Sequence, residues 1–166
     1  MSKSLLVVDS GPLIALAKLG LLGLPGQLFG QVLVPEAVFN ECLAQSQCED
    51  AAAIRQAVAS GVLCRIPADV PSEEVRATKL DPGETAAIAS ALARDAEILI
   101  DERQGRRSAQ ALGLQVIGVC GLLLLGKRAG HVQRLAPLME RLCAVGYYIS
   151  PSLRSGMLAA AGECTD

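Results

Sequence analysis

Short apolar runs alternate along the chain with longer segments of helical periodicity, and this alternation limits the fold more than any other feature. Strands separated by helical segments are typical of βαβ units, in which helices cover both faces of a mostly parallel sheet. The sequence therefore predicts an α/β fold with three layers, α/β/α, around a central sheet of about five strands. The expected strands are residues 5–8, 31–34, 62–66, 97–100 and 115–119.

The segments between these runs carry residues typical of helix boundaries. Gly20 closes the first segment, Pro35 stands where a helix would begin, and Asp81 is a candidate cap for the segment that follows it. Later helices are expected at residues 106–113, 121–130, 131–146 and 151–163. Because no repeat, low-complexity tract or linker interrupts the pattern, residues 1–166 are expected to form a single domain.

Composition excludes several classes of protein. Hydrophobic residues make up 51% of the chain and charged residues 19%, which indicates a globular protein and not a disordered one. The longest apolar run, "VIGVCGLLLLG", is too short to span a bilayer, so we expect a cytoplasmic protein with no membrane partner. The six cysteines form no C-x-x-C pair and His131 is the only histidine, so the usual zinc ligand sets cannot be assembled.

The net charge of −2 argues against a broadly basic surface for nucleic acid. With 2% aromatic residues and no Trp, base stacking on an aromatic platform is also not expected. Any chemistry on nucleic acid must therefore depend on a local site.

Four acidic positions suggest such a site. Asp9 directly follows the first apolar run, and Asp101 with Glu102 follows the fourth. In open parallel sheets, ligands bind beyond the carboxyl ends of the strands. Glu41 and Glu84 lie on the apolar stripes of expected helices, where a carboxylate is costly to bury without a partner. We expect these acids to face one cleft at the carboxyl edge of the sheet.

Each acid also has an ordinary structural interpretation. Asp9 can cap the helix that follows it. Glu84 lies three residues after Asp81, which is the spacing of a capping box. Glu41 can lie partly exposed at the edge of its stripe, and the pair after the fourth run can belong to a solvated turn.

Clustering of these acids would require neutralisation. Two like charges about 4 Å apart repel by roughly 4 kcal/mol at an effective dielectric of about 20, so protons or a cation must offset the repulsion. A site made of carboxylate oxygens suits Mg²⁺ or Mn²⁺. Such an ion polarises a phosphoryl oxygen and lowers the pKa of bound water, which is the chemistry of phosphodiester hydrolysis.

The chain resembles the PIN domain, a compact fold of metal-dependent ribonucleases that includes the VapC-type toxins of bacterial toxin–antitoxin pairs. The likeness is closest to an uncharacterised prokaryotic branch of that family, and it covers most of the chain up to about Gly130. The matching pieces, in order, are "VVDSGPLIALAK", "VLVPEAVFNE", "LDPGETAAIASA", "ILIDERQGRRSAQALG" and "VIGVCGLLLLGKRAG".

The resemblance implies roles for the acids. Asp9 is the first catalytic acid, Glu41 the second, Glu84 the third, and Asp101 or Glu102 the fourth. Asp9, Glu84 and Asp101 are the implied ligands of Mg²⁺ or Mn²⁺. VapC-type sequences usually have Asp at the third position, where this chain has Glu84.

The fourth position stays open because VapC-type sequences carry Thr-x-Asp where this chain has "IDE". Alignment on the end of the strand favours Asp101, whereas alignment of Ile100 on the Thr favours Glu102.

Substrate contacts are expected from two places. Ser10 matches a small hydroxyl residue that accompanies the first acid in the family. Arg103, Arg106 and Arg107 follow the last acids, and their guanidinium groups can fork onto phosphate. The alternative is that these arginines are solvated on a helix surface.

The resemblance implies a divalent-metal-dependent endoribonuclease acting on single-stranded RNA, with the toxin of a toxin–antitoxin pair as one cellular role and an antitoxin as partner. The alternative is a catalytically weak or inactive PIN-like module that binds RNA or a partner protein. A haloacid-dehalogenase-like phosphatase with Asp9 as nucleophile fits less well, since Gly11 stands where that family has a second Asp.

A homodimer is expected because the segments "VIGVCGLLLLGKRAG" and "PLIALAKLGLLGL" are more apolar than one helix face needs. The alternative is that both segments are core in a monomer.

Overall fold

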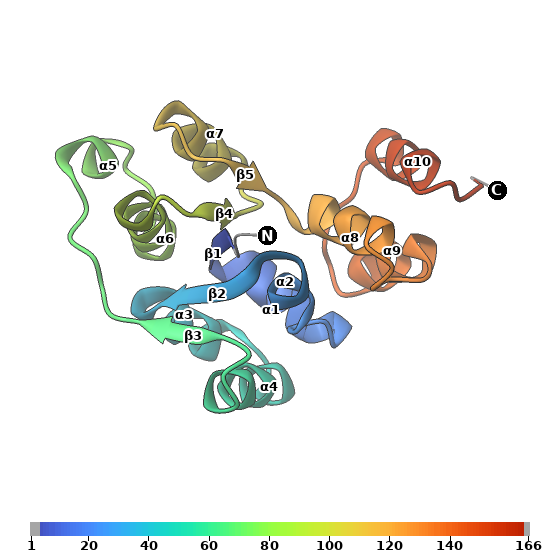
Figure 1. The fold of residues 1–166 in the computed structure, drawn as a ribbon, viewed down its shortest axis with the longest axis horizontal. Coiled ribbons are helices and arrows are strands. Elements are labelled where there is room, and N and C mark those ends of the chain that lie inside the picture. The colour runs from blue at the N-terminus through green and yellow to red at the C-terminus, as the bar shows by residue number, and fades with distance from the viewer. Residues whose placement is uncertain (1–3, 165–166) are drawn as a thin grey trace.

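A five-stranded parallel sheet forms the centre of the molecule, with the strand order β3-β2-β1-β4-β5. The computed structural model describes residues 4–164. Helices pack on both faces of the sheet, which confirms the expected three-layer α/β/α fold (Figure 1). The strands are β1 (Ser4–Val8), β2 (Gly30–Pro35), β3 (Cys64–Ile66), β4 (Glu97–Leu99) and β5 (Val116–Ile117).

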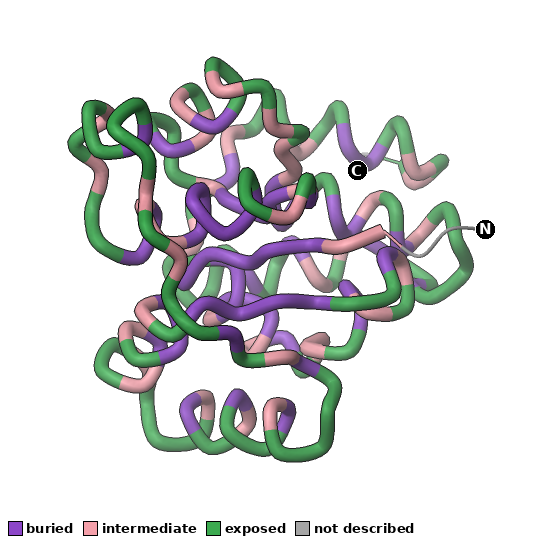
Figure 2. The backbone as a smooth tube through the Cα atoms, turned by 60° about the vertical axis from the view of Figure 1, so that its left-hand side comes forward, coloured by how far each residue is buried: buried purple, intermediate pink, exposed green. Residues whose placement is uncertain are grey.

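Strand β1 contains an uninterrupted apolar run, without the alternation of polar and apolar residues that a strand with one solvent-exposed face would have. This pattern suits its position in the middle of the sheet. Leu6, Val7 and Val8 are fully buried, as expected for a strand covered on both faces. Val7 pairs with Leu33 of β2 on one side and with Ile98 of β4 on the other. Figure 2 shows burial running along the middle of the sheet, with exposure concentrated in the surrounding helices and loops.

Ten helices surround the sheet in the described part of the chain. They are α1 (Ser10–Leu19), α2 (Leu24–Phe29), α3 (Glu36–Gln45), α4 (Cys48–Ala59), α5 (Glu73–Ala77), α6 (Pro82–Arg94), α7 (Arg103–Ala111), α8 (Val119–Arg128), α9 (Leu135–Ala144) and α10 (Pro151–Ala160). Helix α6 packs against β1, β2 and β4, and α8 packs against α9 and α10. Between residues 4 and 164, none of the helices combines the length and hydrophobicity needed to cross a bilayer.

Three helices were not expected from the sequence pattern. Helices α2 and α5 have six and five residues, so they are too short for an apolar pattern to repeat at helical spacing. Helix α4 begins in a polar stretch and has acids in its first turn, and its buried face consists only of Ala51, Ile54 and Ala57. Small apolar residues give a weak periodic signal, so this helix was missed although its spacing is regular.

Candidate active site

Three helices begin close together beyond the carboxyl ends of β1 and β4. Helix α1 follows β1 directly and α7 starts shortly after β4, and these two strands are neighbours in the sheet. The backbone N–H of Asp9 donates to the carbonyl of Leu99 at 2.9 Å, which ties the start of α1 to the end of β4. The N-cap residues of α1, α6 and α7 are Asp9, Asp81 and Glu102. Each carboxylate therefore lies where helix dipoles favour negative charge.

Asp9 is a buried acid whose charge has little compensation. It stands at the N-cap position of α1, but its side chain makes no capping hydrogen bond, and Oδ1 has no hydrogen-bond partner among residues 4–164. Burial is the main cause that raises the pKa of Asp9 to about 7, and the backbone N–H of Ser10 opposes this rise. The negative charges of Glu84, Asp81 and Glu41 raise the pKa of Asp9 further.

Glu84 completes a capping box and also faces the other acids. The Glu84 backbone N–H donates to Asp81 Oδ1 at 2.8 Å, and the Asp81 backbone N–H donates to Glu84 Oε2 at 3.3 Å. Burial, and then the charge of Asp81, raise the pKa of Glu84 to about 7. The nearby carboxyl group of Glu102 also raises the pKa of Glu84, whereas Glu84 lowers the pKa of Glu102, so a proton bound by this pair is favoured on Glu84.

Glu41 reaches the same place from helix α3. A Cβ atom at Gly83 would collide with Glu41 Oε2, so the absence of a side chain at Gly83 leaves space for this carboxylate. Gly83 lies in the first turn of α6, where an anion is favourable. The other oxygen of Glu41 accepts a hydrogen bond from Gln45 Nε2 at 3.0 Å.

Asp101 and Glu102 are consecutive, but their side chains have different surroundings. Glu102 accepts a hydrogen bond from the backbone N–H of Gly105 at 2.8 Å, which is the main cause that lowers its pKa. A Cβ at Gly105 would lie 3.2 Å from Glu84 Oε1, so the first turn of α7 approaches Glu84 closely. The side chain of Glu102 therefore lies on the same side of the site as that of Glu84.

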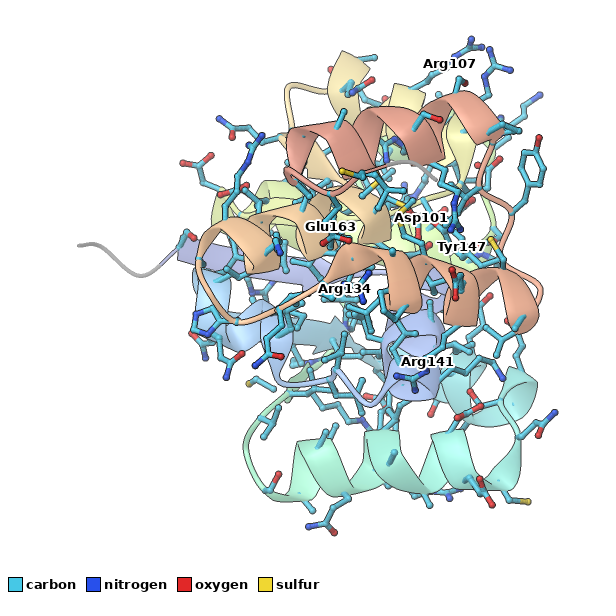
Figure 3. The ribbon with its side chains drawn as sticks, turned by 90° about the vertical axis from the view of Figure 1, so that its right-hand side faces the viewer. Asp101, Arg107, Arg134, Arg141, Tyr147 and Glu163 are labelled. Carbon is cyan, nitrogen blue, oxygen red and sulfur yellow. The ribbon has the colours of Figure 1, made fainter. Side chains whose placement is uncertain are left out.

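Asp101 faces the start of α8. Its Oδ1 accepts a hydrogen bond from the backbone N–H of Val119 at 3.0 Å. The hydroxyl of Tyr147 and the charge of Arg106 lie near it, and neither Asp9 nor Glu84 is among the groups that affect its pKa. Burial raises the pKa of Asp101, and Oδ2 has no partner in hydrogen-bond geometry among the described residues. Figure 3 shows Asp101 beside Tyr147.

The structure therefore brings together four of the expected acids and adds one that was interpreted only as a cap. We call this group the acid cluster; it consists of Asp9, Glu41, Asp81, Glu84 and Glu102. The capping-box spacing of Asp81 and Glu84 was visible in the sequence. What the spacing did not show is that the same turn of α6 faces the end of β1.

The expected substrate-binding residues occupy two environments. Ser10 is buried in the first turn of α1, and its carbonyl oxygen accepts a hydrogen bond from the thiol of Cys42 at 3.8 Å. Arg103, Arg106 and Arg107 lie on α7 and line a pocket that also contains Asp101.

The donor set of the acid cluster suits a hard cation. Its ligands would be carboxylate oxygens, and the unpartnered Oδ1 of Asp9 is free to coordinate. Burial raises the pKa of the neighbouring Cys42 thiol to about 12, so this sulfur stays protonated and is not a ligand. Within residues 4–164, no three Asp, Glu, His or Cys side chains already lie at ligand spacing. Mg²⁺ keeps several waters and needs only one or two carboxylates as direct ligands.

A family model described as a PIN domain matches residues 5–163. The matched range includes every member of the acid cluster, the arginines of α7 and helices α8 to α10, so it extends beyond Gly130. No curated protein matches the chain.

Proposed function

The chain belongs to the PIN domain family, and from this membership we propose that it is a divalent-metal-dependent nuclease that hydrolyses the phosphodiester bonds of single-stranded RNA. PIN domains are generally nucleases and typically use divalent metals. One observation carries the proposal for this chain: a buried Asp9 with an unpartnered oxygen lies among four further carboxylates. A buried carboxylate oxygen without a hydrogen-bond partner is costly, and a bound cation would offset that cost.

Asp9 and Glu84 are the residues that would hold Mg²⁺ or Mn²⁺, with Glu41 and Glu102 beside them. The bound ion would supply Lewis acidity at a phosphoryl oxygen and a lowered pKa for its water. The protein supports this role in two ways. The helix N-termini of α1, α6 and α7 stabilise the negative charge of the carboxylates that gather there. Glu84, whose pKa is raised to about 7, can release its proton when positive charge arrives.

For the fourth acid, the surroundings of the two candidates favour Glu102. Its carboxyl group is near enough to Glu84 to raise the pKa of Glu84, whereas Asp101 accepts a hydrogen bond from Val119 and lies near Tyr147. We therefore assign Glu102 to the proposed metal site, and Asp101, the other candidate ligand from the family resemblance, to its border.

The test is cleavage of a labelled single-stranded RNA by purified protein with Mn²⁺ or Mg²⁺ and with a chelator. We expect metal-dependent cleavage by the parent and a loss of roughly 100-fold or more in Asp9→Asn, the scale of losing one group that stabilises developing charge. Asp95→Asn is the matched control, because it makes the same charge change at the exposed C-terminal end of α6. Equal cleavage by Asp9→Asn and the parent would reject the site.

A second function is favoured by the lack of three acids at ligand spacing among the described residues. In this alternative the chain binds RNA or a partner protein through the same face without cutting. RNA binding by the parent with no cleavage at any Mn²⁺ concentration would support it.

The cellular role that we propose within the first function is that of a toxin neutralised by an antitoxin protein. Growth arrest on expression of the parent, absent with Asp9→Asn, would support this role. Unimpaired growth with active enzyme in the cells would reject it.

A further inference from the structure

Beside the acid cluster lies a second concave site, a pocket of about 470 Å³ bounded by α7, the start of α8 and the segment between α9 and α10. We call it the arginine–tyrosine pocket and define it by Asp101, Arg103, Arg106, Arg107, Tyr147 and Tyr148. The pocket and the acid cluster are adjacent, because Asp101 lies in the pocket and the next residue, Glu102, lies in the cluster. Consecutive Cα atoms are about 3.8 Å apart.

The pocket gathers three arginines, of which Arg106 lies beside Asp101. Arg103, Arg106 and Arg107 are spaced three and four residues apart, so they share one face of α7. None of the ion pairs in the described part of the chain includes them. Arg103 and Arg107 are exposed and make none of these ion pairs, so their guanidinium groups are well suited to fork onto phosphate oxygens.

A glycine keeps one of these arginines close to Asp101. A Cβ atom at Gly118 would lie 2.7 Å from Asp101 Oδ1 and would also collide with Arg106 Nη1. Gly118 therefore leaves the space in which the guanidinium and the carboxylate meet. Arg106 is held at the base of the pocket, whereas Arg103 and Arg107 are exposed at its rim.

The pocket also contains every tyrosine of the chain. The chain has two Tyr, two Phe and no Trp. Phe29 and Phe39 are buried in the core, so the tyrosines are its exposed aromatic surface. Tyr147 is anchored with its hydroxyl near Asp101, and Tyr148 beside it is 83% exposed. An exposed aromatic ring next to free guanidinium groups is the usual arrangement for stacking a base of a single strand.

We propose that the arginine–tyrosine pocket binds one nucleotide of single-stranded RNA adjacent to the acid cluster. The arginines of α7 contact its phosphate and Tyr148 stacks on its base. The inference rests on the proposed function, since it states where the substrate strand lies as it leaves the acids. It also explains how a chain with a net charge of −2 attracts RNA, because the positive charge is concentrated at one place.

The experiment measures binding separately from cleavage. Fluorescence anisotropy with a labelled oligouridine, in the presence of EDTA, reports the Kd without hydrolysis. We expect Tyr148→Ala to raise the Kd roughly 5- to 100-fold and Tyr148→Phe to leave it near the parent value. An abasic oligomer of the same length should bind the parent and Tyr148→Ala equally, since it has no base to stack.

The arginines are tested by salt dependence. Arg107→Gln should reduce the slope of log K against log salt concentration by about 0.7, the value for one phosphate contact on a single strand. Arg55→Gln on α4 is the matched control; Arg55 is exposed and does not line this pocket, and its variant should keep the parent slope. Thermal unfolding of each variant checks that the fold is retained.

The outcomes separate the pocket from the nuclease. Cleavage that depends on Asp9, together with parent-like RNA binding by folded Tyr148→Ala and Arg107→Gln, would overturn the pocket and leave the nuclease standing. Weakened binding by these variants without any cleavage by the parent would support the pocket and reject the nuclease. Absence of RNA binding by the parent would overturn the pocket as an RNA site and favour a protein partner.

Discussion

Asp9 shows how the position of one residue determines its chemistry. A carboxylate after a fully buried strand must either be hydrogen-bonded or be kept protonated, and burial raises the pKa of Asp9 to about 7. Burial, and then the negative charge of Asp81, raise the pKa of the neighbouring Glu84 to about 7 as well. Both acids bind protons in the folded metal-free protein at a pH where the unfolded chain has released them.

This proton binding predicts a pH-dependent stability. In EDTA, the free energy of unfolding should fall as the pH rises from about 4, the pKa of these acids in the unfolded chain, to about 7, their pKa in the folded protein. The fall should be on the order of several kcal/mol, because over this range the unfolded state releases protons that the folded state still binds. The pKa of Glu102 is lowered, so its own contribution is lost only at lower pH. Urea unfolding at several pH values measures the effect. The free energy of unfolding of Asp9→Asn should fall less steeply with pH than that of the parent. That of Asp95→Asn should fall as steeply as that of the parent.

Gly83 offers a second prediction at the scale of one residue. An alanine in a helix normally stabilises relative to glycine, and Gly156→Ala in α10, where nothing lies within 4 Å of the added Cβ, should follow that rule. At Gly83 the added methyl group would displace the Glu41 carboxylate from the first turn of α6. We expect Gly83→Ala to keep its stability within about 1 kcal/mol but to lower RNA cleavage roughly 10-fold or more.

A double-mutant cycle isolates this contact. Glu41→Gln should lower cleavage by a similar factor, and Gly83→Ala combined with Glu41→Gln should be no worse than either change alone. Cleavage losses that multiply would show that Gly83 and Glu41 act independently.

At the scale of elements, two adjacent residues couple the site to different helices. Glu102 caps α7 through Gly105, whereas Asp101 holds the start of α8 through Val119. We therefore expect Glu102→Gln to lower cleavage strongly with little change in stability, because the amide can still accept from the Gly105 N–H. Asp101→Ala should lower the free energy of unfolding by about 1–3 kcal/mol, because it leaves the Val119 N–H without its acceptor.

Cleavage rates and urea unfolding of both variants check this assignment. A larger loss of activity in Asp101→Asn than in Glu102→Gln would contradict it and return Asp101 to the metal site.

For the whole molecule, the expected homodimer remains a prediction, and much of the apolar surface from which it was predicted is buried within the chain. Leu122 and Leu123 of the first apolar segment are fully buried within the chain, as are Leu13 and Leu16 of the second. Of the leucines in α8, Leu125 is the exposed one, at 38%. A dimer would therefore depend on exposed positions of α8 to α10 and not on the bulk of the two segments. Light scattering measures it: a mass near 17.2 kDa at every concentration would exclude the dimer.

The sequence by itself determined the fold class and the positions of the acids along the chain. Both depend on local patterns: strand length and apolar continuity predict a parallel sheet, and an acid directly after a strand must lie at its carboxyl edge. Asp9 and the capping box of Asp81 and Glu84 follow from such patterns, and their residues do lie where the elements begin.

Only the tertiary structure decided which side chains meet. Asp101 and Glu102 are adjacent in sequence, and their different surroundings depend on the packing of α7 and α8, which no local pattern encodes. The same holds for Tyr147, which reaches Asp101 from the segment after α9. Contacts between residues distant in sequence are set by the shape of the whole packed core, and the short apolar runs predict that a core exists without stating which helix ends face one another.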